Sequence, residues 1–203
     1  DVVLTKTMTY DLQELTKTDG VTFDDDAKAY YDRIVVNLAM LCARQLGLPE
    51  HACKVTGSML EKARYKIKTD LGISDEEYTR TEENMLHGVL QGGKASSFIW
   101  VIVSCLLMDI MKNSCNGITF IDPRLRMESN RIMDRFVDDT TVWANQFREH
   151  ARSSITAEFK EYDPKILAQT LQKDAQTWER LLHSTGGELE LTKCFHYIAH
   201  WKC

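Results

Sequence analysis

The chain has 203 residues, of which 43% are hydrophobic and 27% are charged. This length corresponds to about one domain with enough apolar side chains for a core, and the composition excludes disordered and collagen-like chains. The net charge of -5 does not favour a histone-like protein that coats nucleic acid. The longest apolar run, Phe98 to Met108, is shorter than the roughly 18 residues that a membrane span needs, so no membrane partner is expected.

The ends of the chain and its cysteines indicate the cellular setting. Because the chain begins with Asp1 and not with Met, we expect a fragment of a longer protein, and no signal or transit peptide is visible. Six cysteines without a C-x-x-C pair favour a reduced, intracellular protein, in the nucleus or the cytoplasm. The C-terminal segment holds four residues that could bind zinc: Cys194, His196, His200 and Cys203. Their spacing matches no common zinc pattern, and alternation along a strand explains it.

The first part of the chain alternates helical and extended patterns. Apolar residues recur at three- and four-residue steps from Leu4 to Leu15, which predicts an amphipathic helix. Glycine and proline mark the ends of further helices. In chain order we predict a helix from Leu4 that stops before Asp19, a strand over 21–23, helices over 30–46 and 49–62, and strands over 65–68 and 78–81 around a turn at Gly72.

The second part begins with a glycine turn at 91–93, before an apolar segment whose lack of a polar face predicts a buried helix. The Asp138-Asp139 pair interrupts a β-rich segment in the manner of a tight hairpin turn. Asp163 and Pro164 are suited to the start of a helix. In chain order we predict a helix over 96–111, strands over 117–121 and 131–143, a helix from 163 to 185, and a hairpin or strand pair over 189–198. The order predicts an α+β fold with helices on one face of an antiparallel sheet, without an internal domain boundary.

Two aspartate clusters, Asp24-Asp25-Asp26 and Asp138-Asp139, adjoin strongly β-forming residues. Each cluster could simply be a solvated turn. However, carboxylates at the ends of adjacent strands can converge, and converging carboxylates are the hard oxygen ligands that Mg²⁺ prefers. In a two-metal site, such carboxylates hold a pair of ions that stabilise an attacking and a leaving oxygen.

Four segments of the chain resemble motifs of reverse transcriptases, in the order of that family and over most of the chain. Asp26 to Asp32 resembles the first palm motif, and 88–93 followed by 96–99 is similar to the segment that opens a palm helix. Phe136 to Asp139 resembles the aromatic-x-Asp-Asp hairpin, and 187–193 is similar to the segment that closes the palm. The opening helix also resembles the one found in retrotransposon and group II intron-type enzymes.

The resemblance implies roles for particular residues. The ligands of two Mg²⁺ ions, for which Mn²⁺ could substitute, would be Asp26, Asp138 and Asp139. Tyr31, five residues after Asp26, would lie under the sugar and favour deoxynucleotides, although a core aromatic is the alternative. Gln91 and Gly92 would lie near the incoming nucleotide and the template, or would simply form a turn that begins a helix. Lys193 would lie near the triphosphate and could protonate pyrophosphate, or would be a solvated strand residue.

The chain departs from the family pattern at Ser97, where proline is usual, and at Leu90, where a small residue or proline is common. Basic residues gather in two stretches, 54–68 and 124–135, and the second leads into the Asp-Asp hairpin. A stripe of this kind could contact a phosphate backbone, although a solvated face is the alternative.

From these patterns we expect the palm and part of the fingers of an RNA-directed DNA polymerase of a retrotransposon-like element, over residues 1–203. The thumb and any nuclease domain would lie outside the chain, and the isolated fragment would be inactive. Its partners would be an RNA or DNA template with a primer, and deoxynucleoside triphosphates. Two other functions stay open: a non-catalytic, nucleic-acid-binding descendant of the same fold, and an unrelated α+β interaction domain.

Overall fold

The computed structural model describes residues 2–79, 81, 88–89, 93, 95–122, 127–137, 139–145 and 163–201. The chain divides into two compact units, each built from segments that are distant in the sequence. The first, which we call the sheet unit, comprises Asp1–Lys28, Leu107–His183 and Glu188–Cys203, and the second, the helical unit, comprises Ala29–Leu106 and Ser184–Gly187. Because the segments interleave along the chain, no linker in the sequence marks this division.

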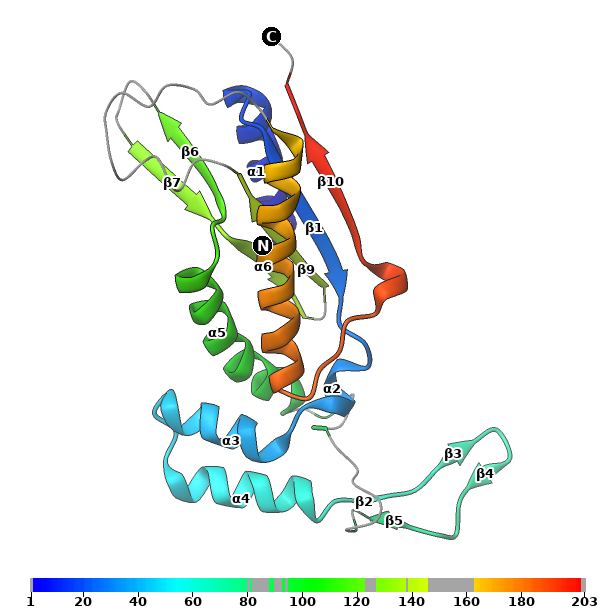
Figure 1. Cartoon of the computed structure of the whole chain (residues 1–203). Coiled ribbons are helices and arrows are strands. Elements are labelled where there is room, and N and C mark those ends of the chain that lie inside the picture. Colours follow the sequence, from blue (N-terminus) through cyan, green and yellow to red (C-terminus); the bar gives the residue numbers. More distant parts are fainter. Residues whose placement is uncertain are drawn as a thin grey trace. The chain divides into compact units, whose positions relative to one another are not determined.

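A four-stranded antiparallel sheet forms the centre of the sheet unit (Figure 1). Its strand order is β10-β1-β9-β8, so the two strands in the middle come from opposite halves of the chain. The strands are β1 (Gly20–Asp26), β8 (Met133–Phe136), β9 (Asp139–Ala144) and β10 (Phe195–Ala199). Successive side chains of a strand point to opposite faces, so β1 presents its odd-numbered residues to one face and its even-numbered residues to the other.

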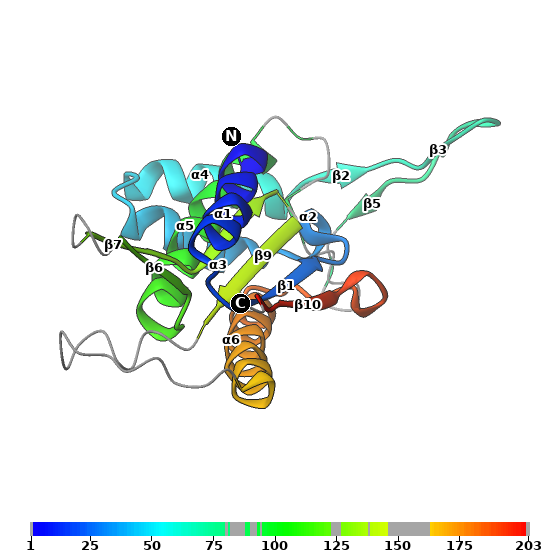
Figure 2. The ribbon, with the colours of Figure 1, turned by 90° about the horizontal axis from the view of Figure 1, so that it is seen from above.

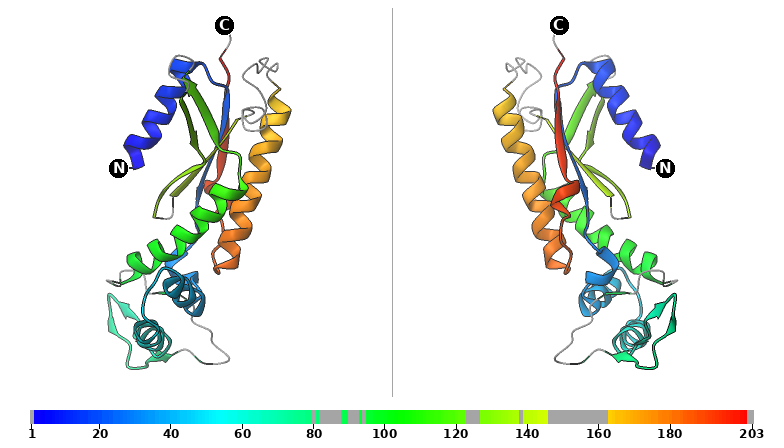
Figure 3. Two further views of the ribbon diagram at one scale, coloured as in Figure 1. Left: turned by 90° about the vertical axis from the view of Figure 1, so that its left-hand side faces the viewer. Right: turned by 90° about the vertical axis from the view of Figure 1, so that its right-hand side faces the viewer.

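The two faces of this sheet are covered by different helices, α1 (Val2–Thr16) and α6 (Pro164–Ser184) (Figure 3). On one face, the ring of Tyr10 of α1 meets Trp143 of β9 edge-on, with 5.0 Å between the ring centroids. On the other face, Leu167 and Leu171 of α6 pack against Val21. The view along the sheet shows α1 and α6 on either side of β9 and β1 (Figure 2). The α+β fold class is confirmed, and α1 adds a helix on the second face.

The strand β1 is longer than the sequence predicts, because it continues through the acidic triplet to Asp26 instead of ending at Phe23. Each of the three aspartates has a partner in β9: Asp24 pairs with Thr141, Asp25 with Thr140, and Asp26 with Asp139. The pattern of the sequence does not reveal this, because aspartate is depleted in strands and usually indicates a turn.

A two-stranded ribbon, β6 (Ile118–Asp122) and β7 (Met127–Arg131), extends the sheet unit. The buried side-chain amide of Asn145, just after β9, joins the ribbon to the end of the sheet. Its Nδ2 donates to the carbonyl oxygen of Thr119 at 3.0 Å, and its Oδ1 accepts from the backbone N–H of Thr119 at 3.3 Å. The amide thus satisfies the backbone groups of β6 as a neighbouring strand would.

The helical unit contains α2 (Tyr30–Arg33), α3 (Val36–Gln45) and α4 (Glu50–Glu61). The prediction of one helix over 30–46 was wrong, because the helix breaks at Ile34, whose ψ is 126°. At the break, the carbonyl oxygen of Ile34 accepts from Gly88 and the N–H of Val35 donates to Thr185, both at 3.0 Å. These non-local hydrogen bonds replace the helical ones, and local spacing carries no information about them.

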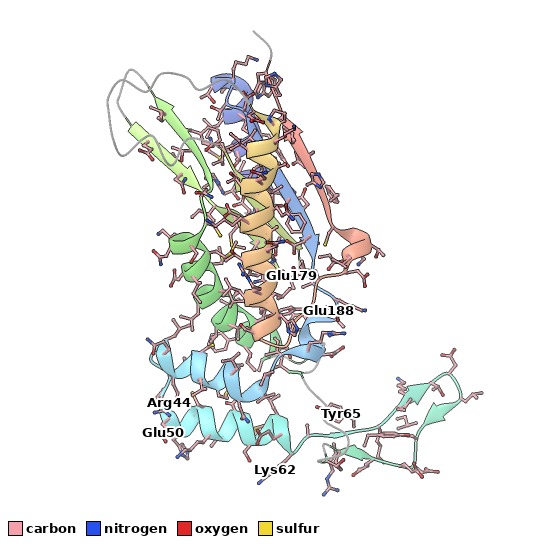
Figure 4. The ribbon with its side chains drawn as sticks, viewed as in Figure 1. Arg44, Glu50, Lys62, Tyr65, Glu179 and Glu188 are labelled. Carbon is pink, nitrogen blue, oxygen red and sulfur yellow. The ribbon has the colours of Figure 1, made fainter. Side chains whose placement is uncertain are left out.

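The predicted helix after Pro49 is confirmed as α4, and α3 and α4 pack side by side in the helical unit. Ala43, Cys53 and Ile102 form the core between them and the first part of α5 (Ser96–Ser114). Arg44, in the last turn of α3, and Glu50, the first residue of α4, form an exposed ion pair at 3.5 Å (Figure 4).

A long hairpin follows α4, and its turn differs from the predicted one. It consists of two short pairs: β2 (Arg64–Tyr65) with β5 (Tyr78–Thr79), and β3 (Lys68–Thr69) with β4 (Gly72–Ile73). The turn is formed by Asp70 and Leu71, because Gly72 is itself the register partner of Thr69.

The helix α5 is confirmed, but the expectation that it is buried on all sides was wrong. Phe98 is 57% exposed and Val101 is 53% exposed, whereas Ile99 and Trp100 are buried. An apolar sequence without a polar face cannot show which side meets the rest of the chain. By length and composition α5 could cross a membrane, but a core helix passes the same test, and 44% of its apolar window is buried.

The C-terminal segment forms a short 3-10 turn, η2 (Leu191–Lys193), followed by the single strand β10. The predicted hairpin or strand pair was wrong, because β10 pairs with the distant strand β1 and not with its own neighbour in sequence. Among the described residues, no group of three or more His, Cys, Asp or Glu side chains could hold a metal ion. Cys203 lies outside those residues, and the five described cysteines are free thiols.

Candidate metal centre

The register of β1 and β9 brings two of the predicted metal ligands face to face. Asp26, the last residue of β1, is the direct cross-strand partner of Asp139, the first residue of β9. The Cβ atoms of direct partners in an antiparallel pair lie roughly 4.5–5.5 Å apart, with both side chains on the same face of the sheet. The two carboxylates are therefore within reach of one cation. The third predicted ligand, Asp138, lies outside the described residues.

The Asp26 carboxylate already has a cationic partner within the chain. The Lys193 ammonium, at the end of η2, forms an ion pair with Asp26 Oδ2. The backbone supports this arrangement, because the Glu190 N–H donates to the carbonyl oxygen of Asp26 at 2.9 Å. The side chain of Asp26 is 17% exposed, whereas that of Lys193 is 64% exposed. The ammonium is therefore largely solvated, whereas the carboxylate that it pairs with is mostly buried.

Asp24 shares the face of Asp26 but is held by the protein itself. Its carboxylate forms an ion pair with Lys6 of α1 at 2.7 Å and accepts a hydrogen bond from the Thr141 hydroxyl. Both contacts use the same carboxylate oxygen. Asp24 therefore ties α1 to the sheet, which agrees with the choice of Asp26 over Asp24 as the metal ligand.

Asp25 points to the opposite face and is buried beneath α6. Its Oδ1 accepts a hydrogen bond from the indole N–H of Trp178 at 3.3 Å, and its Oδ2 is buried without a hydrogen-bond partner among the described residues. Burial raises the pKa of Asp25 to about 7, although the Trp178 hydrogen bond and the nearby Arg135 charge oppose the shift. This carboxyl group faces away from the candidate metal site and cannot be one of its ligands.

The hairpin that carries the Asp-Asp pair has an unusual backbone. Phe136 and Asp139 are register partners, so the chain reverses direction between them. Val137 adopts a positive φ of 55°. The Arg135 Nε donates to the carbonyl oxygen of Val137 at 3.1 Å, and the Arg135 guanidinium carbon lies 4.8 Å from the centroid of the Trp178 ring.

The remaining predicted site residues are Tyr31, Gln91 and Gly92. Tyr31 lies in α2, within the helical unit, where its ring meets that of Tyr30 edge-on at 6.1 Å. Tyr30 is the buried core aromatic of the pair and packs on Trp100. Gln91 and Gly92 lie outside the described residues.

Sequence reasoning missed the buried cluster of Asp25, Arg135 and Trp178. Arg135 was part of a basic stretch, and Trp178 lay within the helix predicted from 163 to 185. The sequence held one signal for the position of Arg135. A tight turn directly after Phe136 places Arg135 opposite Thr140. Side chains alternate along a strand, so both residues lie on the face opposite to that of Asp139. The pairing of Thr140 with Asp25 has no such local signal.

Comparison by fold finds related structures, whereas a scan against protein families and a search of curated proteins find no match by sequence. The apo telomerase from Candida tropicalis, truncated from its C-terminal domain, is similar over 99% of this chain, with a TM-score of 0.61 and 15% identity. The telomerases from Candida tropicalis and Candida albicans in complex with a fragment of telomeric RNA match over 98% and 100% of the chain, with TM-scores of 0.59 and identities of 16% and 14%.

The chain spans about a third of the length of these telomerases: 35%, 29% and 30% of the three chains. At such low identity, the similarity shows the fold alone. The catalytic core of telomerase has a reverse transcriptase fold, and the chain therefore has a reverse-transcriptase-like α+β fold.

Proposed function

We propose that this chain is the palm, with part of the fingers, of an RNA-directed DNA polymerase from a retrotransposon-like element. One observation carries the proposal, namely that Asp26 and Asp139 are direct cross-strand partners. They come from two strands separated by more than half of the chain, and both belong to segments that resemble reverse transcriptase motifs. The similarity of the fold to telomerase supports the same class of enzyme. Template and primer are then the nucleic-acid partners.

Three carboxylates hold the metal in this proposal: Asp26, Asp138 and Asp139. Oxygen ligands of this kind suit Mg²⁺, and Mn²⁺ can take its place. A pair of such ions, when bound, stabilises the attacking and the leaving oxygens of an in-line phosphoryl transfer. The reaction joins a primer 3'-hydroxyl to the α-phosphate of a deoxynucleotide and releases pyrophosphate.

Four further residues bind the nucleotide in this proposal. Tyr31 lies against the sugar and excludes a 2'-hydroxyl, while Gln91 and Gly92 contact the incoming nucleotide and the template. The ammonium of Lys193 moves from Asp26 to the triphosphate and gives a proton to the leaving pyrophosphate. The template sequence is read by base pairing, so the protein itself shows little base specificity.

The test is primer extension by the full-length protein with Mg²⁺ and a primed template. Asp138→Ala and Asp139→Ala should each abolish extension, because each removes a metal ligand. Asp11→Ala is the matched control, since Asp11 is an exposed aspartate of α1, and it should retain the wild-type rate. Equal activity of the wild type and Asp138→Ala would refute the assignment.

The ion pair between Lys193 and Asp26 favours one rival function, a nucleic-acid-binding protein of the same fold that does not catalyse. In such a protein, the lysine would permanently occupy the place of the metal. Titration with Mn²⁺ distinguishes the two functions. Binding that is lost in Asp26→Asn supports the polymerase, whereas an absence of Asp26-dependent binding, with nucleic-acid binding retained, supports the rival.

A further inference from the structure

The turn that carries the Asp-Asp pair is strained at its first residue. Val137 has a φ of 55° in the tight turn between Phe136 and Asp139. Such turns need a positive φ at this place, and they usually have Gly, Asn or Asp there. A β-branched residue in this region is a conformational outlier, and it persists only where the surrounding structure holds it.

Arg135 supplies such a hold from the other face of the sheet. Its Nε donates to the carbonyl oxygen of Val137 at 3.1 Å, two residues along the chain. The guanidinium carbon of Arg135 also lies 4.8 Å from the centre of the Trp178 ring, so the group faces the buried tryptophan of α6. The Nε of Arg135 therefore contacts the hairpin, and the plane of its guanidinium group contacts α6, which packs on the sheet.

Arg135 has polar neighbours on the same face. Arg135, Thr140 and Asp25 lie in one row across β8, β9 and β1. Asp25 accepts the indole N–H of Trp178 at 3.3 Å, and the electrostatic attraction of Arg135 favours its charged form. Trp178 thus contacts both Arg135 and Asp25, and this fixes the position of the arginine relative to the sheet.

The carbonyl group that accepts from Arg135 belongs to the peptide bond between Val137 and Asp138. Its orientation sets the direction in which the chain leaves Val137 on the way to Asp139. We propose that Arg135 is a positioning residue, which acts from the α6 face of the sheet to hold the left-handed Val137 and so to aim Asp139 at Asp26. The part about the metal rests on the proposed function, whereas the part about the hairpin does not.

Lysine should not replace Arg135 in this role. The Nε–H that donates to Val137 and the flat surface that faces Trp178 both belong to the guanidinium, and an ammonium group has neither. Arg135→Lys therefore keeps the positive charge but removes the hydrogen bond to Val137 and the flat contact with Trp178. Val137→Gly removes the need for the hold, because glycine adopts a positive φ without strain.

The experiment is a double-mutant cycle on the full-length protein, with Arg135→Lys, Val137→Gly and both together. Hydrogen exchange of the β9 amides, measured without metal, reports the local stability of the hairpin. Arg135→Lys should accelerate this exchange in the Val137 protein and change it much less in the Val137→Gly background. Arg131→Lys is the matched control, since Arg131 pairs with Asp134, and its effect should be the same in both backgrounds.

Mn²⁺ affinity is the second readout. Arg135→Lys should weaken Mn²⁺ binding by about tenfold, as do other changes to groups that orient metal ligands, and this loss should shrink in the Val137→Gly background. Equal effects of Arg135→Lys in both backgrounds, for exchange and for Mn²⁺, would overturn the proposal. If the wild type binds no Mn²⁺, the proposed function fails, and the hydrogen exchange alone then decides the role of Arg135.

Discussion

At the scale of single residues, three consecutive aspartates of β1 have three different surroundings. Asp24 is paired with Lys6, Asp25 is buried under Trp178, and Asp26 is paired with the exposed side chain of Lys193. The alternation of a strand explains the division, because it sends Asp25 to the α6 face and the other two to the α1 face. Chemical identity alone would make the three equivalent.

In the proposed metal site, Lys193 would compete with the ion for Asp26. Lys193→Met should therefore strengthen Mn²⁺ binding, and because Lys193 is largely solvated, we expect about a three- to tenfold gain. Electron paramagnetic resonance of free Mn²⁺ measures the affinity, and the gain should shrink at high salt. Lys165→Met, which removes an exposed lysine of α6, should leave the affinity unchanged. Weaker Mn²⁺ binding in Lys193→Met would contradict this competition.

Asp25 makes stability depend on pH. Its folded pKa of about 7 lies above the ordinary value of 3.8, so between these values the folded state holds a proton that the unfolded state has lost. The free energy of unfolding should therefore fall as the pH rises from 4 to 7, by at most about 1.4 kcal/mol per pH unit. Asp25→Asn keeps an acceptor for Trp178 and should reduce this slope. Urea unfolding at several pH values measures it, and an unchanged slope in the variant would assign the dependence to other groups.

At the scale of elements, the glycines that follow two of the helices differ in how tightly they are packed. Gly186, just beyond α6, has a φ of +92°, and a Cβ at this position would collide with the carbonyl oxygen of Arg33. Gly47, after α3, has a similar φ of +95°, but a Cβ there would meet nothing within 4 Å. The sequence predicts a helix end at both glycines, whereas only the structure shows that one of them is also tightly packed.

This pair of glycines allows a matched test. Gly47→Ala should destabilise the chain by about 1–2 kcal/mol, which is the cost of a left-handed conformation for a residue with a Cβ. Gly186→Ala should cost clearly more, because the backbone must also move away from Arg33. Thermal or urea unfolding measures both values. Equal losses would show that the backbone at Gly186 relaxes freely.

At the scale of the whole molecule, the two units should open separately, because each has its own core. Leu171 is 4% exposed and packs with Val21, Ala144 and Leu167 in the sheet unit. Leu171→Ala should destabilise this unit by about 2–5 kcal/mol. Hydrogen exchange should accelerate in β1, β9 and α6 and change little in α3 and α4. Ile166→Ala, at a position of α6 that is 48% exposed, is the control with little effect. Equal acceleration in α3 and α4 would show a single cooperative unit.

The sequence by itself determined the types of most elements and the candidate carboxylates. Helical spacing indicated α1 and α6, Pro49 indicated the start of α4, and a long apolar segment indicated α5. Asp163, whose carboxylate accepts the N–H of Lys165 at 2.8 Å, marked the start of α6. Such signals are local, because residues three or four apart share one face of a helix and side chains alternate along a strand. They are visible without any knowledge of the fold.

The tertiary structure alone decided which carboxylates meet. The pairing of Asp26 with Asp139, the burial of Asp25 and the hold of Arg135 on Val137 beneath α6 depend on the order of strands and on the helix that covers each face. The same holds for the break at Ile34, where distant backbone groups replace helical hydrogen bonds. These contacts join residues that are far apart in the chain, and only the packed structure brings them together.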